Sequence, residues 1–274
     1  MLARVLTAAI GAPLALLALF QLPRVGFVAV VVVLLLIAAA ELARLGRALG
    51  AGRAMALLPA LVLICALVLL GGDPVRLAGL NAGSRSLLLA LLVAAGAPLA
   101  ALWAGGTMRE RGLAANFLGF GALYLALPIA AFDQLRARDP WLVVLLLATV
   151  WLTDTGAFLC GTRWGKHKLA PLVSPNKSWE GFWGGLLLGL AAASVCSWWR
   201  LGTLEPSWLA AGFVVSVAGQ LGDLLESMFK RAAGVKDSGN LLPGHGGMLD
   251  RLDSLILAAP VLELLWRLLH PSAS

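Results

Sequence analysis

The sequence predicts an all-α fold, that of a polytopic integral membrane protein with about nine transmembrane helices. Of its 274 residues, 60% are hydrophobic and only 13% are charged, and the mean hydropathy is +0.90. A soluble domain of this size carries about a quarter charged residues. Apolar runs close to the roughly 20 residues that cross a bilayer recur from one end of the chain to the other.

The predicted spans follow one another with short connecting loops. They cover residues 5–22, 26–43, 54–71, 86–104, 114–133, 141–161, 182–199, 208–230 and 249–268. The first span follows one arginine, as the apolar region of a signal peptide does, but no convincing small-residue cleavage site comes after it. A second span begins almost at once, so we expect the first to be retained as a helix.

The basic residues are distributed unevenly between alternate loops. If the N-terminus and every second loop lie on one side of the membrane, that side holds most of the 21 lysines and arginines. Cytoplasmic loops carry such an excess. We therefore expect the N-terminus and the two elaborate loops, 162–181 and 231–248, to face the cytoplasm, in a membrane of the bacterial inner (plasma) type. The C-terminus is then outside, and the net charge of +7 does not indicate binding to nucleic acid.

The two halves of the chain differ in polar content. Residues 1–140 are mainly Leu, Ala and Val, which predicts N-terminal transmembrane helices. We expect these helices to serve lipid access and, as the resemblance described below implies, dimer packing. Residues 141–274 contain both elaborate loops and most intramembrane acids, so chemistry is expected there. Cys65, Cys160 and Cys196 lie in apolar runs without pairwise spacing, which indicates neither a metal site nor disulfides.

The eighth span contains an unusual set of polar residues. Four of them recur at i, i+3, i+7 and i+10, and so share one stripe of a helix: Gln220, Asp223, Ser227 and Lys230. Glu226 lies beside this stripe. An aspartate at the centre of a lipid-exposed helix costs about 2.5–3.5 kcal/mol, so Asp223 must face a wet cavity or a counter-charge. A snorkelling helix end would explain Lys230 but not the deeper Asp223.

The ninth span repeats this arrangement at its start. Asp250, Asp253 and Ser254 share one face, and Arg251 is turned aside. The positive end of the helix dipole favours both carboxylates. An N-terminal cap with an Asp–Arg pair would account for one aspartate, but not for two on one face. Because carboxylates from neighbouring helices are the usual ligands of Mg²⁺, we favour a metal site.

The segment between these two spans combines glycines with basic residues. Glycines such as Gly246 and Gly247 allow positive φ, and the following helix start offers unpaired N–H groups. With Lys236 they predict an anion-binding cradle, although a flexible polar linker would have a similar composition. His245 could contact phosphate or transfer a proton, and a hydrogen bond at the helix start is about equally plausible.

The loop 162–181 contains a second group of candidates. Asp154 lies near the cytoplasmic end of the preceding span. The stretch "SPNKSWEG" predicts a turn at Ser174–Asn176 that presents Lys177 to phosphate, with Ser178 as the N-cap of the seventh helix. We interpret Lys168 as plain positive-inside charge.

At these residues the sequence resembles the phosphatidate cytidylyltransferases, or CDP-diacylglycerol synthases. The family signature runs from Ser227 to Asp253, and every fixed position is met. These positions are Ser227, Lys230, Arg231, Lys236, Asp237, Gly239, Leu242, Pro243, His245, Gly246, Gly247, Asp250, Arg251 and Asp253. The upstream "DTGA" and "SPNKSWEG" are also similar to the family, so the resemblance covers roughly residues 150–270. One departure is "AFLCG", where family members often have "AYFFG"; no tyrosine hydroxyl is available at Phe158.

The resemblance implies that CTP and phosphatidate give CDP-diacylglycerol and pyrophosphate, in phospholipid biosynthesis. It also implies Mg²⁺ on Asp223 and Asp250, a monovalent cation such as K⁺, and a homodimer. From the residues and the resemblance together, we expect catalytic roles for Lys177, Lys230, Arg231, Lys236, Asp237, His245 and Arg251. We expect substrate binding by Asp154, Ser174, Asn176, Lys177, Ser227, Gly246 and Gly247, and metal binding by Asp223, Asp250 and Asp253.

Three other functions are compatible with parts of the pattern. A CTP-using polyprenol kinase would share basic loops and membrane acids, but would transfer the γ-phosphate. Intramembrane acids also mark ion paths, as in an ion-coupled transporter. Here, however, the polar residues cluster at two loops, and no paired broken helices recur in two related halves. A purely structural scaffold would not need five acids near one mouth.

Overall fold

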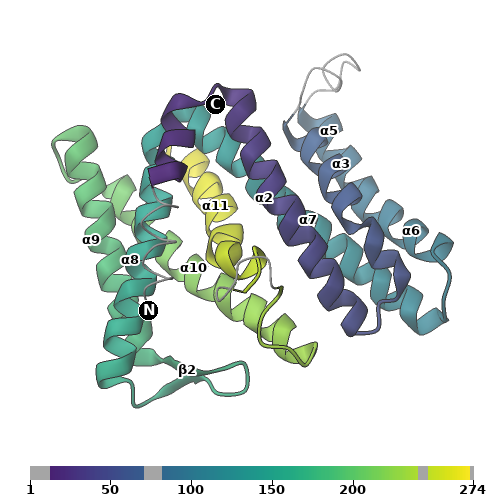
Figure 1. Cartoon of the computed structure of the whole chain (residues 1–274). Coiled ribbons are helices and arrows are strands. Elements are labelled where there is room, and N and C mark those ends of the chain that lie inside the picture. Colours follow the sequence, from purple (N-terminus) through teal and green to yellow (C-terminus); the bar gives the residue numbers. More distant parts are fainter. Residues whose placement is uncertain (1–12, 71–81, 240–245, 272–274) are drawn as a thin grey trace. The chain divides into compact units, whose positions relative to one another are not determined.

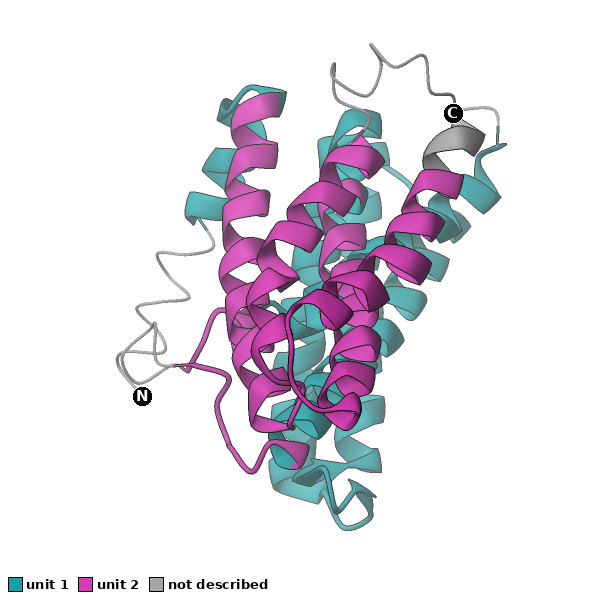
Figure 2. Ribbon diagram, turned by 90° about the vertical axis from the view of Figure 1, so that its right-hand side faces the viewer, with its two compact units in different colours: residues 1–24, 131–231, 252–274 teal, residues 25–130, 232–251 magenta. Residues whose placement is uncertain are grey.

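The computed structural model describes residues 13–70, 82–239 and 246–271, and most of these residues are in helices (Figure 1). The chain divides into two compact units (Figure 2). Unit 1 comprises residues 1–24, 131–231 and 252–274, and unit 2 comprises residues 25–130 and 232–251. The units interleave in the sequence, and each is described by itself. The functional division at residue 140 stays a prediction.

Six described helices are long and apolar enough to cross a membrane, so the protein is an integral membrane protein. They are Arg24–Ala48, Arg53–Leu70, Met108–Arg138, Pro140–Trp164, Trp179–Leu201 and Pro206–Ala232. The part of every predicted span that the structure describes is helical, apart from the end residues 22 and 104. The count of nine crossing helices stays a prediction.

Unit 1 is built on α8 (Pro140–Trp164), α9 (Trp179–Leu201), α10 (Pro206–Ala232) and most of α11 (Leu249–Leu269). The local sequence caps the start of one of these helices and the end of another. Asp139 accepts a hydrogen bond from the N–H of Trp141 (3.0 Å) at the start of α8, where Pro140 needs no partner. Gly202, with φ of +74°, ends α9.

Glycines allow the helices of unit 1 to approach closely. A Cβ atom on Gly156 of α8 would lie 2.5 Å from the carbonyl oxygen of Gly184 in α9. A Cβ on Gly222 of α10 would lie 2.6 Å from the carbonyl oxygen of Asp253 in α11. In the absence of a hydrophobic driving force between helices in lipid, small residues permit such backbone contact. The glycines therefore bring α8, α10 and α11, which carry Asp154, Asp223 and Asp253, close to their neighbours.

A short hairpin joins α8 to α9. Strand β1 (Lys168–Ala170) pairs antiparallel with β2 (Ser174–Ser178), with Lys168 opposite Ser178. The predicted turn at Ser174–Asn176 is therefore wrong, because these residues form β2 and the turn comes before them. Pro175 is tolerated because a two-stranded sheet leaves each strand one open edge. The predicted N-cap is confirmed: the hydroxyl of Ser178 accepts from the N–H of Gly181 (3.1 Å).

Arginines attach the N-terminal part of unit 1 to the end of α7 (Met108–Arg138). Arg24 forms two hydrogen bonds with the buried carboxylate of Asp133, at 2.8 and 2.7 Å. Arg136 donates to the carbonyl oxygens of Leu19 (2.9 Å) and Leu22. A paired guanidinium and carboxylate avoid the penalty of a lone buried charge.

Unit 2 contains α2 (Arg24–Ala48) from Val25, the 3₁₀ turn η1 (Arg53–Leu57), α3 (Leu58–Leu70), α5 (Ala82–Leu91), the π turn η2 (Leu92–Gly96), α6 (Ala97–Trp103) and most of α7. The predicted span 86–104 is thus interrupted. Pro98 has no N–H for the carbonyl of Ala94, which is consistent with the local π turn. Thr107 and Glu110 form a capping box at the start of α7, with hydrogen bonds of 3.1 and 3.3 Å.

Candidate active site

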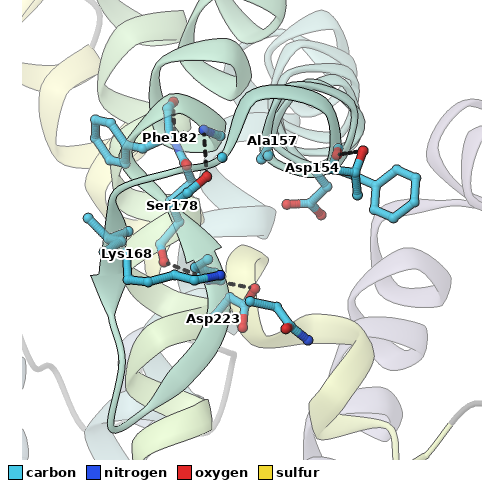
Figure 3. Close-up of a pocket in the computed structure, with 15 residues that line it drawn as sticks. Asp154, Ala157, Lys168, Ser178, Phe182 and Asp223 are labelled. Atoms are coloured by element: carbon cyan, nitrogen blue, oxygen red, sulfur yellow. Dashed lines mark hydrogen bonds and ion pairs between the residues drawn. The ribbon is translucent and has the colours of Figure 1, made fainter.

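Unit 1 contains a cavity of about 630 Å³, a size typical of small-molecule sites (Figure 3). Its wall is formed by α8, the hairpin, α9 and α10. The polar side chains on it are Asp154, Thr162, Lys168, Asn176, Lys177, Ser178, Gln220 and Asp223. Apolar lining comes from Ala157, Phe158, Leu169 and Phe182. Phe158, where the family often has tyrosine, thus lines the cavity.

Two residues of this polar wall form an ion pair. The Nζ of Lys177 is 2.7 Å from Oδ2 of Asp223, and both side chains are partly exposed. The hydroxyl of Ser227 donates to Asp223 at 3.3 Å, one helical turn away. The ammonium of Lys177 also approaches the carbonyl oxygen of Gln220 at 3.5 Å. The predicted phosphate ligand and the predicted metal ligand are therefore direct partners.

Two further carboxylates share the neighbourhood of Asp223. Asp154 reaches the cavity from α8 (Figure 3). Asp253 of α11 is partly buried and interacts electrostatically with Asp223, Asp154 and Lys230. Three carboxylates so placed repel one another, and that repulsion is relieved by cations. The arrangement therefore favours positive charge beside Asp223.

These residues fit a Mg²⁺ ion of the kind that is bound together with substrate. Among the described residues, no three metal-binding side chains lie close enough to hold an ion by themselves. Mg²⁺ in phosphate-transfer sites usually takes one or two carboxylates and completes its shell with water and substrate phosphates. Asp223, with Asp154 and Asp253 near it, offers the oxygen ligands that such an ion prefers.

The hairpin contributes more to the cavity than the sequence predicts. Strand β2 places Asn176 and Lys177 on the wall, whereas Ser174 pairs with Ala170 and does not line it. Lys168, interpreted above as topological charge, lines the cavity as well. This position of Lys168 follows from the pairing of β1 with β2, which places Lys168 opposite Ser178, next to Lys177. A prediction of that pairing would have identified Lys168 as a cavity residue.

The two basic residues at the end of α10, Lys230 and Arg231, contact different partners. Lys230 forms an ion pair with Glu226, whose side chain is fully buried, one helical turn away. Arg231 is exposed, and its Nε lies 3.4 Å from the carbonyl oxygen of Val173 in the hairpin turn. Lys230 therefore balances the buried charge of Glu226 within α10, and Arg231 links α10 to the hairpin. Their predicted roles toward phosphate stay predictions.

The remaining predicted residues belong to unit 2. The carboxylate of Asp250 accepts from the N–H of Gly247 (2.7 Å) and from both the N–H and the hydroxyl of Ser238 (2.9 Å each). Gly246 has φ of +77°, and a Cβ on it would lie 2.6 Å from Oδ2 of Asp250. Three others are exposed: Lys236, Asp237 and Arg251. His245 lies outside the described residues.

Sequence reasoning missed one acid in unit 2. Glu41 of α2 is fully buried, and it accepts from the N–H groups of Met248 (3.0 Å) and Leu249 (2.8 Å) and from the hydroxyl of Ser238 (2.9 Å). The helix-start N–H groups expected to bind phosphate therefore donate to carboxylates of the protein itself. A single glutamate inside an apolar run was the signal that could have identified it.

The fold and the cavity define a class of protein: an integral membrane protein whose polar cavity combines lysines with carboxylates. The model of the cytidylyltransferase family matches residues 2–269, so the chain belongs to this family. Among curated proteins, it is 43% identical over 153 residues to the phosphatidate cytidylyltransferases of Staphylococcus aureus (strain COL) and Staphylococcus epidermidis. It is 44% identical over 153 residues to that of Staphylococcus haemolyticus. Each alignment covers 55% of this chain and 58% of the relative, a little over half of each.

Proposed function

We propose that the protein is a phosphatidate cytidylyltransferase. An oxygen of the phosphatidate phosphate attacks the α-phosphorus of CTP, the bond from that phosphorus to the β-phosphate oxygen breaks, and pyrophosphate leaves. CDP-diacylglycerol is the other product. The observation that carries the proposal is the cavity of unit 1, where Lys168 and Lys177 lie with Asp154 and Asp223, in a chain of the cytidylyltransferase family.

The chemistry requires charge compensation more than proton transfer. The attacking phosphate is already an oxyanion, so no strong base is needed. The obstacle is repulsion between two polyanions, followed by charge on the leaving pyrophosphate. Lys168 and Lys177, both on the hairpin, can place ammonium groups against phosphate oxygens. Asn176 and Ser178 provide polar groups on the same wall.

The carboxylates would hold the metal ion. Mg²⁺ bound at Asp223, with Asp154 and Asp253 near it, would supply positive charge to the α-phosphoryl group and the leaving oxygens. Asp223 would then exchange its pairing with Lys177, which becomes available to phosphate. The pairing of Asp223 with Asp250 rests on the sequence and the resemblance, as does the use of K⁺.

The proposed location and assembly of the protein rest on the sequence and on the resemblance. The excess of basic residues in alternate loops supports an active site that faces the cytoplasm, in the bacterial inner membrane. The apolar surface of the helices supports access for phosphatidate from the surrounding lipid. The homodimer rests on the resemblance.

Labelled CTP tests the reaction directly. Purified protein in detergent is supplied with phosphatidate, Mg²⁺ and CTP labelled at the α-phosphorus. Label should enter the lipid, and γ-labelled CTP should release its label as pyrophosphate. A lipid kinase would show the opposite, with γ-label in the lipid and none from the α-position. That result, or no transfer from either position by folded protein, would contradict the proposal.

A further inference from the structure

Unit 2 contains a fully buried carboxylate that the proposed reaction does not use. Glu41 lies in α2, about 200 residues before the segment that it contacts, and no part of its side chain is exposed. Among the residues that the structure describes, Arg44 forms an ion pair with Glu41 at 3.9 Å, and the arginine side chain is 55% exposed. So long an ion pair with an exposed arginine compensates little of the negative charge of Glu41. Hydrogen-bond donors around the carboxylate must therefore stabilise it.

The start of α11 provides those groups. The N–H groups of Met248 and Leu249 donate to Oε1 and Oε2 of Glu41, at 3.0 and 2.8 Å. N–H groups at a helix start lack partners within the helix and attract anions. The carboxylate of Glu41 thus fills the position that an external anion would take, and it joins α2 to the start of α11.

Two glycines lie so close to this carboxylate that any larger residue would collide with it. A Cβ on Gly239 would lie 2.6 Å from Oε1 of Glu41, and the three atoms nearest to it all belong to Glu41. A Cβ on Gly247 would collide with Oε2 of Glu41 and with the hydroxyl oxygen of Ser238. The glycines at these positions of the signature therefore leave room for Glu41.

The same contacts reach Asp250. The hydroxyl of Ser238 lies 2.9 Å from Oε2 of Glu41 and 2.9 Å from Oδ2 of Asp250, and its single proton can serve one of them at a time. The N–H groups of Ser238 and Gly247 also donate to Asp250. A displacement of Ser238 or of the start of α11 would therefore disturb the hydrogen bonds that hold Asp250.

We propose that Glu41 is a positioning residue, which fixes Ser238, Gly247 and the start of α11, and through them the carboxylate of Asp250. Glu41 itself touches no substrate. Its effect on turnover rests on the proposed function, in which Asp250 is an expected metal ligand. Its effect on the local structure of unit 2 does not.

Hydrogen exchange tests the structural part without any substrate. In Glu41→Gln one oxygen is replaced by a donor, and in Glu41→Ala all three acceptor contacts are lost. A peptide containing residues 247–249 should exchange about tenfold faster than wild type or more, and Glu41→Ala should exceed Glu41→Gln. Asp133→Asn is the matched control, because it also neutralises a buried carboxylate paired with arginine, but in unit 1. Wild-type exchange in both Glu41 variants would overturn the inference.

A second variant covers the case in which the Glu41 variants do not fold. Gly239→Ala presses directly on the Glu41 carboxylate and should also accelerate exchange at residues 247–249. If either Glu41 variant folds, Gly239→Ala should add little to Glu41→Ala, because the atoms that it would meet are gone. Slow, wild-type exchange in Gly239→Ala, or an equal effect of this substitution in both backgrounds, would contradict the role of Glu41.

Enzyme kinetics test the functional part. In Glu41→Gln the Mg²⁺ concentration for half-maximal cytidylyl transfer should rise about tenfold, as when an outer-shell partner of a metal ligand is lost. A purely structural role would lower the amount of active protein and leave that concentration unchanged. If wild-type protein transfers no label from CTP, the proposed function fails and the exchange experiment still decides the inference. If wild type is active and Glu41→Gln has an unchanged Mg²⁺ requirement, the inference fails alone.

Discussion

Asp223 and Lys177 show how one pair of residues can serve two predicted roles. Their 2.7 Å ion pair neutralises both groups inside a partly buried cavity. A substrate that carries phosphates and a divalent cation offers each of them a stronger partner of opposite charge. The pair can therefore separate on binding without leaving either charge uncompensated.

Substitution of the acids should remove activity. We expect Asp223→Ala and Asp250→Ala each to reduce kcat by at least about 100-fold, since each change removes charge that stabilises the transition state. Membrane insertion should be unaffected, because the hydropathy of the helices increases. Turnover with labelled CTP and the yield of purified protein provide the two measurements. Near-wild-type turnover by folded Asp223→Ala would exclude it as a metal ligand.

The two cavity lysines should act differently from a lysine outside the cavity. Lys168→Ala and Lys177→Ala remove charge from the wall of the cavity, and we expect each to lower kcat/KM for CTP by about 10-fold or more. Lys166→Ala, in the same loop but not on the cavity wall, is the matched control and should have little effect. Equal losses in all three variants would indicate a general effect of charge rather than ligands in the cavity.

At the scale of the elements, close helix packing places the acids. Gly156, Gly184 and Gly185 let α8 and α9 approach until backbone meets backbone. Because α8 carries Asp154 and the hairpin connects the two helices, their separation sets the width of the cavity. If alanine replaced one of these glycines, its methyl group would push α8 and α9 apart. That movement would displace α8, which carries Asp154.

This interface can be tested with a single methyl group. Gly156→Ala would place a Cβ 2.5 Å from the carbonyl oxygen of Gly184, so we expect a loss of stability of about 1–3 kcal/mol. Gly112→Ala is the matched control in α7, because nothing lies within 4 Å of its added Cβ. It should be neutral or stabilising, since alanine favours helix. Thermal unfolding in detergent compares the two, and equal stability of both variants would refute close packing at Gly156.

At the scale of the whole molecule, the chain combines an apolar exterior with a few polar sites. Large hydrophobic side chains such as Leu187 and Phe213 are exposed on helices long enough to span a bilayer. In a soluble protein such surface would cause association, whereas here lipid covers it. The basic loops then set the orientation.

The orientation predicts which loops can be labelled from each side. In a variant without native cysteines, Lys166→Cys should react with an impermeant maleimide from the cytoplasmic side only. Glu205→Cys, beyond the other end of α9, should react from the outside only. Vesicles of both orientations provide the comparison. The reverse labelling pattern would contradict the predicted cytoplasmic active site.

Much of this architecture could be predicted, but the hairpin and Glu41 could not. Spans were recognisable because hydropathy is a local property of about 20 consecutive residues. The turn assigned to Ser174–Asn176 was wrong because strand pairing depends on the partner segment, Lys168–Ala170, which has no strong strand pattern of its own. Glu41 was overlooked because it lies in a largely apolar run, and the N–H groups that donate to it lie about 200 residues later.

By itself, the sequence determined that the protein crosses a membrane several times and carries the cytidylyltransferase signature near its C-terminus. Both follow from residues that are close in the chain, where composition and spacing suffice. Only the tertiary structure decided that Lys168 and Lys177 share one cavity with Asp154 and Asp223, and that Glu41 holds the start of α11. The reason is that such groups meet only after glycine contacts bring helices together and a hairpin folds back, which depends on the packing of distant segments.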